Sequence, residues 1–258
     1  MPESRSLLRP SRTRSDPPGV AADSGTWVEL RLLSAFELWR CGTRLRLPLS
    51  AQRVVAFVAL HEEPVLRARV AGSLWLDSPE GRAGANLRSA LWRVHRVEPG
   101  LVDASERDLR LGRAVRVDLR EAENFARATL REDVGEYVDV DSLTGDLLPG
   151  WYADWVLFER ERFRQLRLRA LDTLSERLTR AGRIDEALEA GLLSVAGEPL
   201  RESAHRAVIQ AHLADGNTFE ALREYRLFRR LMREQLGLEP SWRIRELVAG
   251  LDDQETER

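Results

Sequence analysis

The chain has 258 residues and a net charge of −2, a length that is enough for two domains that each bury a hydrophobic core. No apolar run approaches the ~18 residues of a membrane span, nothing near the start resembles a signal peptide, and the single Cys41 excludes an internal disulfide. We therefore expect a cytoplasmic protein with no membrane partner. All 40 basic residues are arginines, which excludes a P-loop lysine, a kinase-type lysine and a Schiff-base lysine.

The charge is divided unevenly along the chain. Residues 1–117 contain 19 arginines and 13 acidic residues, whereas residues 118–258 contain 21 arginines and 29 acidic residues. A basic half joined to an acidic half predicts a polyanion-binding module followed by a protein-binding module. Ordinary surface variation is the alternative that charge alone leaves open.

The first segments predict a tail and a small sheet. Residues 1–25 are rich in Arg, Pro, Ser and Gly, which predicts a disordered tail. Alternating apolar and polar residues then predict three antiparallel strands at 27–33, 35–39 and 44–48. Ser50 is positioned to cap a helix over 51–61.

Two more helices and a hairpin follow. The second helix is predicted over about 66–76 and the third over roughly 82–97. Short alternating stretches predict a terminal β-hairpin from the segments 101–102, 109–111 and 115–117. A sheet, three helices and a hairpin are the plan of a winged helix-turn-helix domain, which we place at 26–117.

The third predicted helix has an apolar face and a polar face. At 100° per residue, Leu87, Ala90, Leu91 and Val94 share the apolar face, and residues 82–96 contain four arginines and no acid. Arginine pairs with guanine or phosphate and asparagine with adenine, so the polar face predicts contact with a DNA major groove; a solvated helix face is the alternative. The candidate DNA-binding residues here are Arg82, Asn86, Arg88, Ser89, Trp92, Arg93 and Arg96.

Trp92 is a large aromatic residue on this polar face and needs a partner. The partner is the hairpin or the second domain in one interpretation, and the DNA backbone or thymine methyl groups in the other. The hairpin adds Arg107, Arg110 and Arg113 as candidate contacts of a wing over 101–117. Arg110 is equally suited to the solvent side of an alternating strand.

The second half is predicted to consist of paired helices over 159–181 with 184–195, and 201–214 with 218–236. Gly182-Arg-Ile-Asp-Glu-Ala-Leu188 recurs 34 residues later as Gly216-Asn-Thr-Phe-Glu-Ala-Leu222, which is the repeat length of a tetratricopeptide hairpin. We therefore predict an all-α repeat domain at 118–251 with a concave surface for peptides or helices, and a short tail at 252–258.

Three aromatic residues precede the first long helix of this half. Trp151, Tyr152 and Trp155 are interpreted as a core through which the two domains dock, because large aromatic side chains favour burial. A ligand cage is the less favoured alternative.

Several motifs resemble a bacterial regulatory family. Asn86-Leu-Arg-Ser-Ala-Leu-Trp-Arg93 and its surrounding elements are similar to the OmpR-type DNA-binding domain of the Streptomyces antibiotic regulatory proteins. The rest resembles the bacterial transcriptional activator domain of that family in the motifs Gly145-Asp-Leu-Leu-Pro-Gly-Trp151, Asp154-Trp155, Glu198-Pro-Leu-Arg-Glu-Ser-Ala-His205 and Gly237-Leu-Glu-Pro240. One departure is Arg107-Asp108, where the family wing often carries a Gly-Tyr pair.

The resemblance covers nearly the whole chain and implies an α+β winged-helix domain followed by an all-α tetratricopeptide-like domain. It implies sequence-specific binding to double-stranded promoter DNA, contact with RNA polymerase holoenzyme, and often a homodimer on direct-repeat sites. The chain shows no catalytic, metal or cofactor motif, so we expect it not to be an enzyme. The alternative function is an interaction adaptor that does not bind DNA and holds a protein or peptide on its helical repeats.

Overall fold

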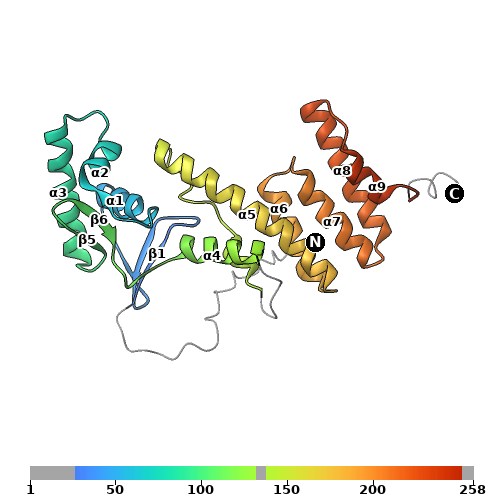
Figure 1. Cartoon of the computed structure of the whole chain (residues 1–258), viewed down its shortest axis with the longest axis horizontal. Helices are drawn as coiled ribbons and strands as arrows, with labels where there is room; N and C mark the ends of the chain where they lie inside the picture. The colour runs from blue at the N-terminus through green and yellow to red at the C-terminus, as the bar shows by residue number, and fades with distance from the viewer. Residues whose placement is uncertain (1–26, 132–137, 252–258) are drawn as a thin grey trace, which may run out of the picture.

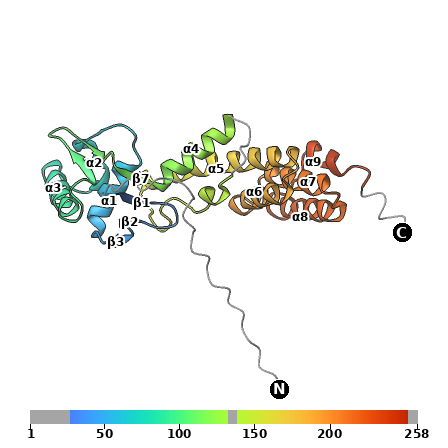
Figure 2. The ribbon, with the colours of Figure 1, turned by 90° about the horizontal axis from the view of Figure 1, so that it is seen from below.

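The computed structural model describes residues 27–131 and 138–251, so the predicted tails at 1–25 and 252–258 lie outside the described residues. The described chain forms an N-terminal α+β part, and a helical part extends away from it along the long axis of the molecule (Figures 1 and 2). The predicted fold class is confirmed. No helix among the described residues is long and apolar enough to cross a bilayer.

The elements follow in the order that the sequence predicts, with additions. The strands are β1 (Val28–Arg31), β2 (Glu37–Arg40), β3 (Thr43–Leu45), β4 (Val65–Leu66), β5 (Val102–Ala104), β6 (Asp108–Leu111) and β7 (Val115–Val117). The helices are α1 (Leu49–Ala59), α2 (Arg67–Leu74), α3 (Glu80–Val97), α4 (Asp118–Arg131), the 3₁₀ turn η1 (Val140–Leu143), α5 (Asp154–Arg180), α6 (Ile184–Gly197), α7 (Glu202–Ala214), α8 (Thr218–Leu236) and α9 (Trp242–Val248).

The N-terminal sheet is mixed rather than purely antiparallel. Its strand order is β3-β2-β1-β7, and β7 runs parallel to β1 with Leu30 opposite Val117. The prediction that 115–117 belongs to the terminal hairpin is therefore wrong, because the hairpin consists of β5 and β6, with β4 as a third strand. The chain leaves the hairpin at Gly112, where a Cβ atom would lie 1.9 Å from the carbonyl oxygen of Gly100.

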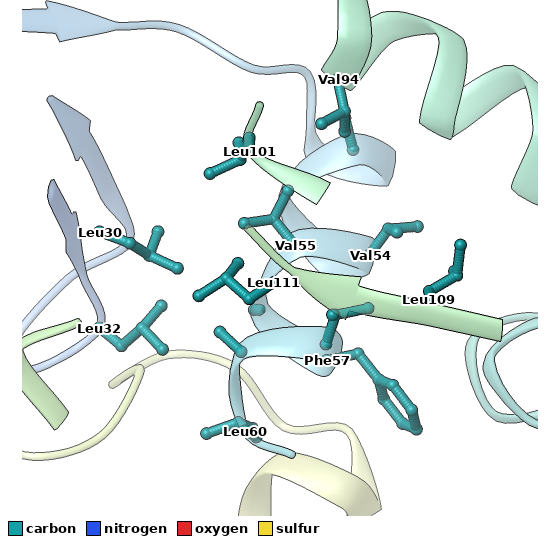
Figure 3. Close-up of a cluster of buried hydrophobic side chains, with 14 of the residues drawn as sticks. Leu30, Leu32, Val54, Val55, Phe57, Leu60, Val94, Leu101, Leu109 and Leu111 are labelled. Atoms are coloured by element: carbon teal, nitrogen blue, oxygen red, sulfur yellow. The ribbon is translucent and has the colours of Figure 1, made fainter. Parts of the chain in front are cut away.

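Helix α1 lies at the centre of the N-terminal core. Val54 and Val55 on α1 are buried and face Leu30 of β1, Leu109 of β6 and Val94 of α3 (Figure 3). Each such aliphatic side chain stabilises the fold by roughly 1.5–3 kcal/mol relative to full exposure. Helix α3 and the hairpin are therefore both fixed by their packing on α1.

The predicted helix cap at Ser50 is wrong. Helix α1 starts two residues earlier, at Leu49 with Pro48 at its N-cap, and no side chain caps it. The carbonyl oxygen of Pro48 instead accepts hydrogen bonds from the backbone N–H groups of Ala51 and Gln52, at 2.9 and 3.0 Å. Ser50 thus lies inside the first turn, where its hydroxyl group serves another contact described below.

The helical part contains two hairpins, α5–α6 and α7–α8, as the 34-residue repeat predicts (Figure 1). Gly182 and Gly216 follow equivalent helices with φ angles of 74° and 77°, a left-handed conformation that favours glycine. Ala187 and Ala221 are both fully buried, so each position lets neighbouring helices approach closely. The repeated residues therefore have a packing role.

Two helices were not predicted, and α5 starts earlier than expected, at Asp154 rather than at 159. Helix α4 packs along α5 and buries Leu119, Ala122 and Ala126. The short helix α9 covers the end of α7 and α8 with Ile244 and Val248.

The N-terminal and helical parts share one hydrophobic core. The loop before α5 extends the end of β1, since Leu148 N donates to Leu32 O and Ser34 N donates to Asp146 O, both at 2.8 Å. Trp155 of α5 lies edge-on to Phe57 of α1, with ring centroids 5.2 Å apart.

The prediction that the three aromatic residues before α5 form a docking core is confirmed for two of them. Trp151 and Trp155 are half-buried and pack against the shared core. Tyr152 contradicts the prediction, because it is 79% exposed. The side chain of Tyr152 therefore does not join the core that contains Trp151 and Trp155.

Asp118, the first residue of α4, joins the two parts by hydrogen bonds. Its carboxylate accepts from the backbone N–H groups of Leu32 at 2.8 Å, Leu33 at 3.0 Å and Leu119 at 2.7 Å. Burial raises the pKa of Asp118, while these three donors favour the charged form and act in the opposite direction.

We expect Asp118→Asn to lower the free energy of unfolding at pH 7 by about 1–3 kcal/mol. The side-chain NH2 group of asparagine replaces a carboxylate oxygen, so one of the three backbone N–H groups loses its hydrogen-bond acceptor. The pKa of Asp118 is raised in the folded state. As the pH falls, the Asp118 carboxylate is therefore protonated in the folded wild type before it is protonated in the unfolded chain, and this difference stabilises the folded wild type. The deficit of the variant should therefore widen between pH 7 and pH 4 in urea unfolding experiments. A deficit that narrows over this range would contradict the assignment.

Candidate nucleic-acid interface

Helix α3 separates apolar and polar residues onto opposite faces, as predicted. Leu87, Ala90 and Val94 are buried, and Leu91 is half-buried against the same core. The helix starts at Glu80, before the predicted start, and an acid in the first turn suits the positive end of the helix dipole. Residues 81–97 contain no acid, so the outward face presents positive charge without a competing carboxylate of its own.

The structure exposes nearly all the candidate residues of this helix together. Asn86 is half-buried at the edge of the polar face. The exposed candidates are Arg82, Arg88, Ser89, Trp92, Arg93 and Arg96.

Arg93 connects α3 to the start of α1. Its Nη1 donates to the hydroxyl oxygen of Ser50 at 3.2 Å. This bond orients the guanidinium group along the outer surface, where its remaining N–H groups face solvent. Ser50, expected as a helix cap, is therefore a positioning residue for a candidate DNA contact.

Trp92 is 59% exposed, which does not agree with the interpretation that the hairpin or the second domain covers it. The guanidinium carbon of Arg96, one helical turn further on, lies 4.9 Å from the centre of the Trp92 ring. This is the distance of a cation–π contact, and the two side chains form a pair on the outward face.

The hairpin turn between β5 and β6 is fixed by one serine. Ser105 Oγ accepts from the backbone N–H groups of Arg107 at 3.1 Å and Asp108 at 2.9 Å. Arg67, at the start of α2, donates from its backbone N–H to Arg107 O at 2.9 Å and from Nη1 to Ser105 O at 3.0 Å. The turn and the N-terminus of α2 are thereby held side by side.

The structure does not bring the three candidate arginines of the hairpin together. Arg107 is exposed in the turn. Arg110 lies on β6 and forms an ion pair with Asp103 across the hairpin at 3.2 Å, which agrees with the solvent-side alternative. Arg113 is exposed at the other end of β6, in the segment that leads to β7.

Sequence analysis missed the arginines at the start of α2. Arg67 contacts the hairpin turn, and Arg69 is exposed beside it on the same helix. The sequence signal was the segment Arg67-Ala-Arg69, which has no acid next to it at a helix start. Its closeness to residues 105–107 depends on the pairing of β4 with β6 and could not be read locally.

Asp172 and His205 are buried in the helical part, and both have structural partners. Asp172 accepts from Ser194 Oγ at 2.6 Å, Arg201 Nε at 2.8 Å and Ser203 Oγ at 2.7 Å, which links α5, α6 and α7. His205 is fully buried, with Nδ1 2.7 Å from Glu224 Oε1. The described residues contain no cluster of three or more His, Cys, Asp or Glu side chains that could hold a metal ion.

Comparisons with known proteins agree with this architecture. The family model for the bacterial transcriptional activator domain matches residues 101–251, more than half of the chain. The regulatory protein AfsR of Streptomyces coelicolor is 28% identical over 92% of this chain. A structure of Mycobacterium tuberculosis EmbR in complex with a low affinity phosphopeptide aligns over 89% of this chain with a TM-score of 0.66 and 17% identity. This chain spans 25% of the length of AfsR and 66% of the EmbR chain.

We expect Ser105→Ala to loosen the hairpin turn, because two backbone N–H groups lose their acceptor. The free energy of unfolding should fall by about 1–2 kcal/mol, and amide hydrogen exchange should accelerate at residues 107 and 108. Ser89→Ala is the matched control, since Ser89 is exposed on α3 and alanine is the better helix former. Equal effects of the two substitutions on exchange at the turn would contradict the role of Ser105.

Proposed function

Because this chain belongs to the bacterial transcriptional activator domain family, with the domain order of the Streptomyces antibiotic regulatory proteins, we propose that it is a sequence-specific DNA-binding transcriptional activator. In this proposal residues 26–117 bind promoter DNA, with the helix at 82–97 in the major groove and the β5–β6 hairpin over 102–111 beside it as the wing. Residues 118–251 are the activator domain.

The observation that carries the proposal is the exposed face of α3. It combines four arginines, an asparagine and a serine without an acid, on a helix whose other face is fixed in the core. The turn at 105–107 and the start of α2 add Arg67, Arg69 and Arg107. A DNA interface needs side chains that contact base edges and, beside them, side chains that bind phosphates.

The resemblance supports the remaining parts of the proposal. The protein acts in the cytoplasm on the nucleoid, and the acidic helical part contacts RNA polymerase holoenzyme at the promoter. Two copies bind adjacent direct repeats. No catalytic step belongs to this function.

DNA binding is tested by selecting duplexes from a random pool and then measuring affinity as a function of salt. We expect enrichment of one sequence and an affinity that falls steeply with salt, because bound arginines release counterions from phosphates. Arg93→Ala and Arg69→Ala should each reduce the slope of log K against log salt by about one. Arg245→Ala, which removes an exposed arginine of α9, is the matched control and should leave the slope unchanged.

The adaptor is the second candidate function. It is supported by the stacked helical hairpins and by the EmbR structure, whose printed description includes a bound phosphopeptide. If no duplex is enriched and binding does not depend on salt, the DNA-binding proposal is wrong. Capture of a stable protein partner together with that result would favour the adaptor.

A further inference from the structure

Trp92 lies near the centre of the exposed face of α3. At 100° per residue, the nearest residues in direction are Ala85, at about 20°, and Arg88 and Arg96, each at about 40°. The indole is 59% exposed on a helix that otherwise presents charged and small polar groups outward. An exposed indole ring among guanidinium groups can contact an apolar group of a bound partner.

Arg96 is held over this ring in a way that leaves its donors free. The guanidinium carbon of Arg96 lies 4.9 Å from the centre of the Trp92 ring, which is a cation–π distance. A guanidinium group that stacks on an aromatic ring keeps the N–H groups in its plane available to a ligand. Arg96 forms no ion pair with an acidic side chain among the described residues, and the contact with Trp92 limits its rotamers before any ligand binds.

The two exposed groups correspond to two features of the major groove. A guanidinium edge pairs bidentately with O6 and N7 of guanine, whereas an apolar ring contacts the 5-methyl group of thymine. Neighbouring base pairs are 3.4 Å apart along the axis, so a stacked pair of side chains can meet two successive base pairs.

We propose that Trp92 and Arg96 act as one recognition unit that reads a guanine through Arg96 and the thymine of the adjacent base pair through Trp92. This inference rests on the proposed DNA-binding function. It assigns sequence specificity to this pair, whereas Arg93, Arg69 and Arg107 contact phosphates and add affinity. Trp92 is then exposed because its partner is the methyl group of a base.

The chain contains a matched control for the pair. Trp242 on α9 is 62% exposed, and the guanidinium carbon of Arg243 lies 5.7 Å from its ring centre. Trp242→Ala therefore removes an equally exposed, arginine-associated tryptophan outside the proposed interface.

The experiment uses the duplex enriched by the full-length chain and changes single atoms or groups of its bases. Uracil replaces each thymine in turn, which removes only the methyl group, and 7-deazaguanine replaces each guanine, which removes N7. For the wild type, uracil at one position should weaken binding about 4-fold, as expected for one buried methyl group. 7-Deazaguanine at the adjacent base pair should weaken binding about 10-fold or more.

The variants assign these effects to side chains. Trp92→Ala should bind thymine and uracil duplexes equally, while Trp242→Ala should keep the 4-fold difference. Arg96→Ala should lose the discrimination at the guanine. Because all three side chains are exposed, circular dichroism should show the same folded content for each variant.

Two results would overturn the inference in distinguishable ways. If a duplex is enriched but no thymine position responds to uracil, or if Trp92→Ala retains the response, the recognition unit is wrong and the proposed function stands. If no duplex is enriched at all, the proposed function fails, and the inference fails with it.

Discussion

Helix α1 is buried on two sides, and the arrangement of the whole molecule depends on this packing. On one side it holds α3 and the hairpin through the core of the N-terminal part. On the other side Phe57 meets Trp155, and Arg120 of α4 donates from Nη2 to the carbonyl oxygens of Ala59 and His61 at 3.2 and 3.0 Å. The aromatic pair adds roughly 0.5–1.5 kcal/mol beyond burial, and the charged hydrogen bonds add to it. A rotation of α3 against the helical part would have to break these contacts.

One family motif serves this connection, and another stabilises the helical part itself. In the motif 145–151, the carbonyl oxygens of Leu147 and Trp151 accept from the guanidinium group of Arg160 on α5, at 2.7 and 2.9 Å. The motif 198–205 supplies Arg201, Ser203 and His205 to the buried hydrogen bonds between helices. The first motif thus ties the start of α5 to the loop that pairs with the end of β1, and the second motif holds α5, α7 and α8 together within the helical part.

The sequence predicted the features that depend on local periodicity. The two faces of α3 and the helical hairpins around Gly182 and Gly216 follow from residue spacing over more than one helical turn. Features that depend on distant pairing were missed. The alternation of Val115 and Val117 is the same whether their strand joins the hairpin or pairs with β1. The direction of Tyr152, exposed between half-buried neighbours, is likewise not encoded in its residue type.

In the candidate interface, too, local features were predicted and features that depend on distant pairing were not. The exposure of Arg82, Arg88 and Arg93 followed from the helical pattern, whereas the position of Arg67 at the hairpin turn required the three-dimensional pairing of β4 and β6. The contact between Arg96 and Trp92 could not be predicted from the sequence. Residues four apart on a helix are neighbours, but their side chains can also turn toward solvent or toward other residues. The positive charge of α3 alone indicates a polyanion as the partner. The contact between Trp92 and Arg96 is the feature that suggests recognition of bases.

In the proposed complex, α3 and the hairpin turn bind DNA while the helical part stays free for another partner. Amide hydrogen exchange of the full chain, measured with and without a saturating amount of the enriched duplex, distinguishes the two parts. We expect slower exchange in residues 81–97 and 105–107 and unchanged exchange in α6, α7 and α8. Protection confined to the helical part, or none in α3, would contradict it.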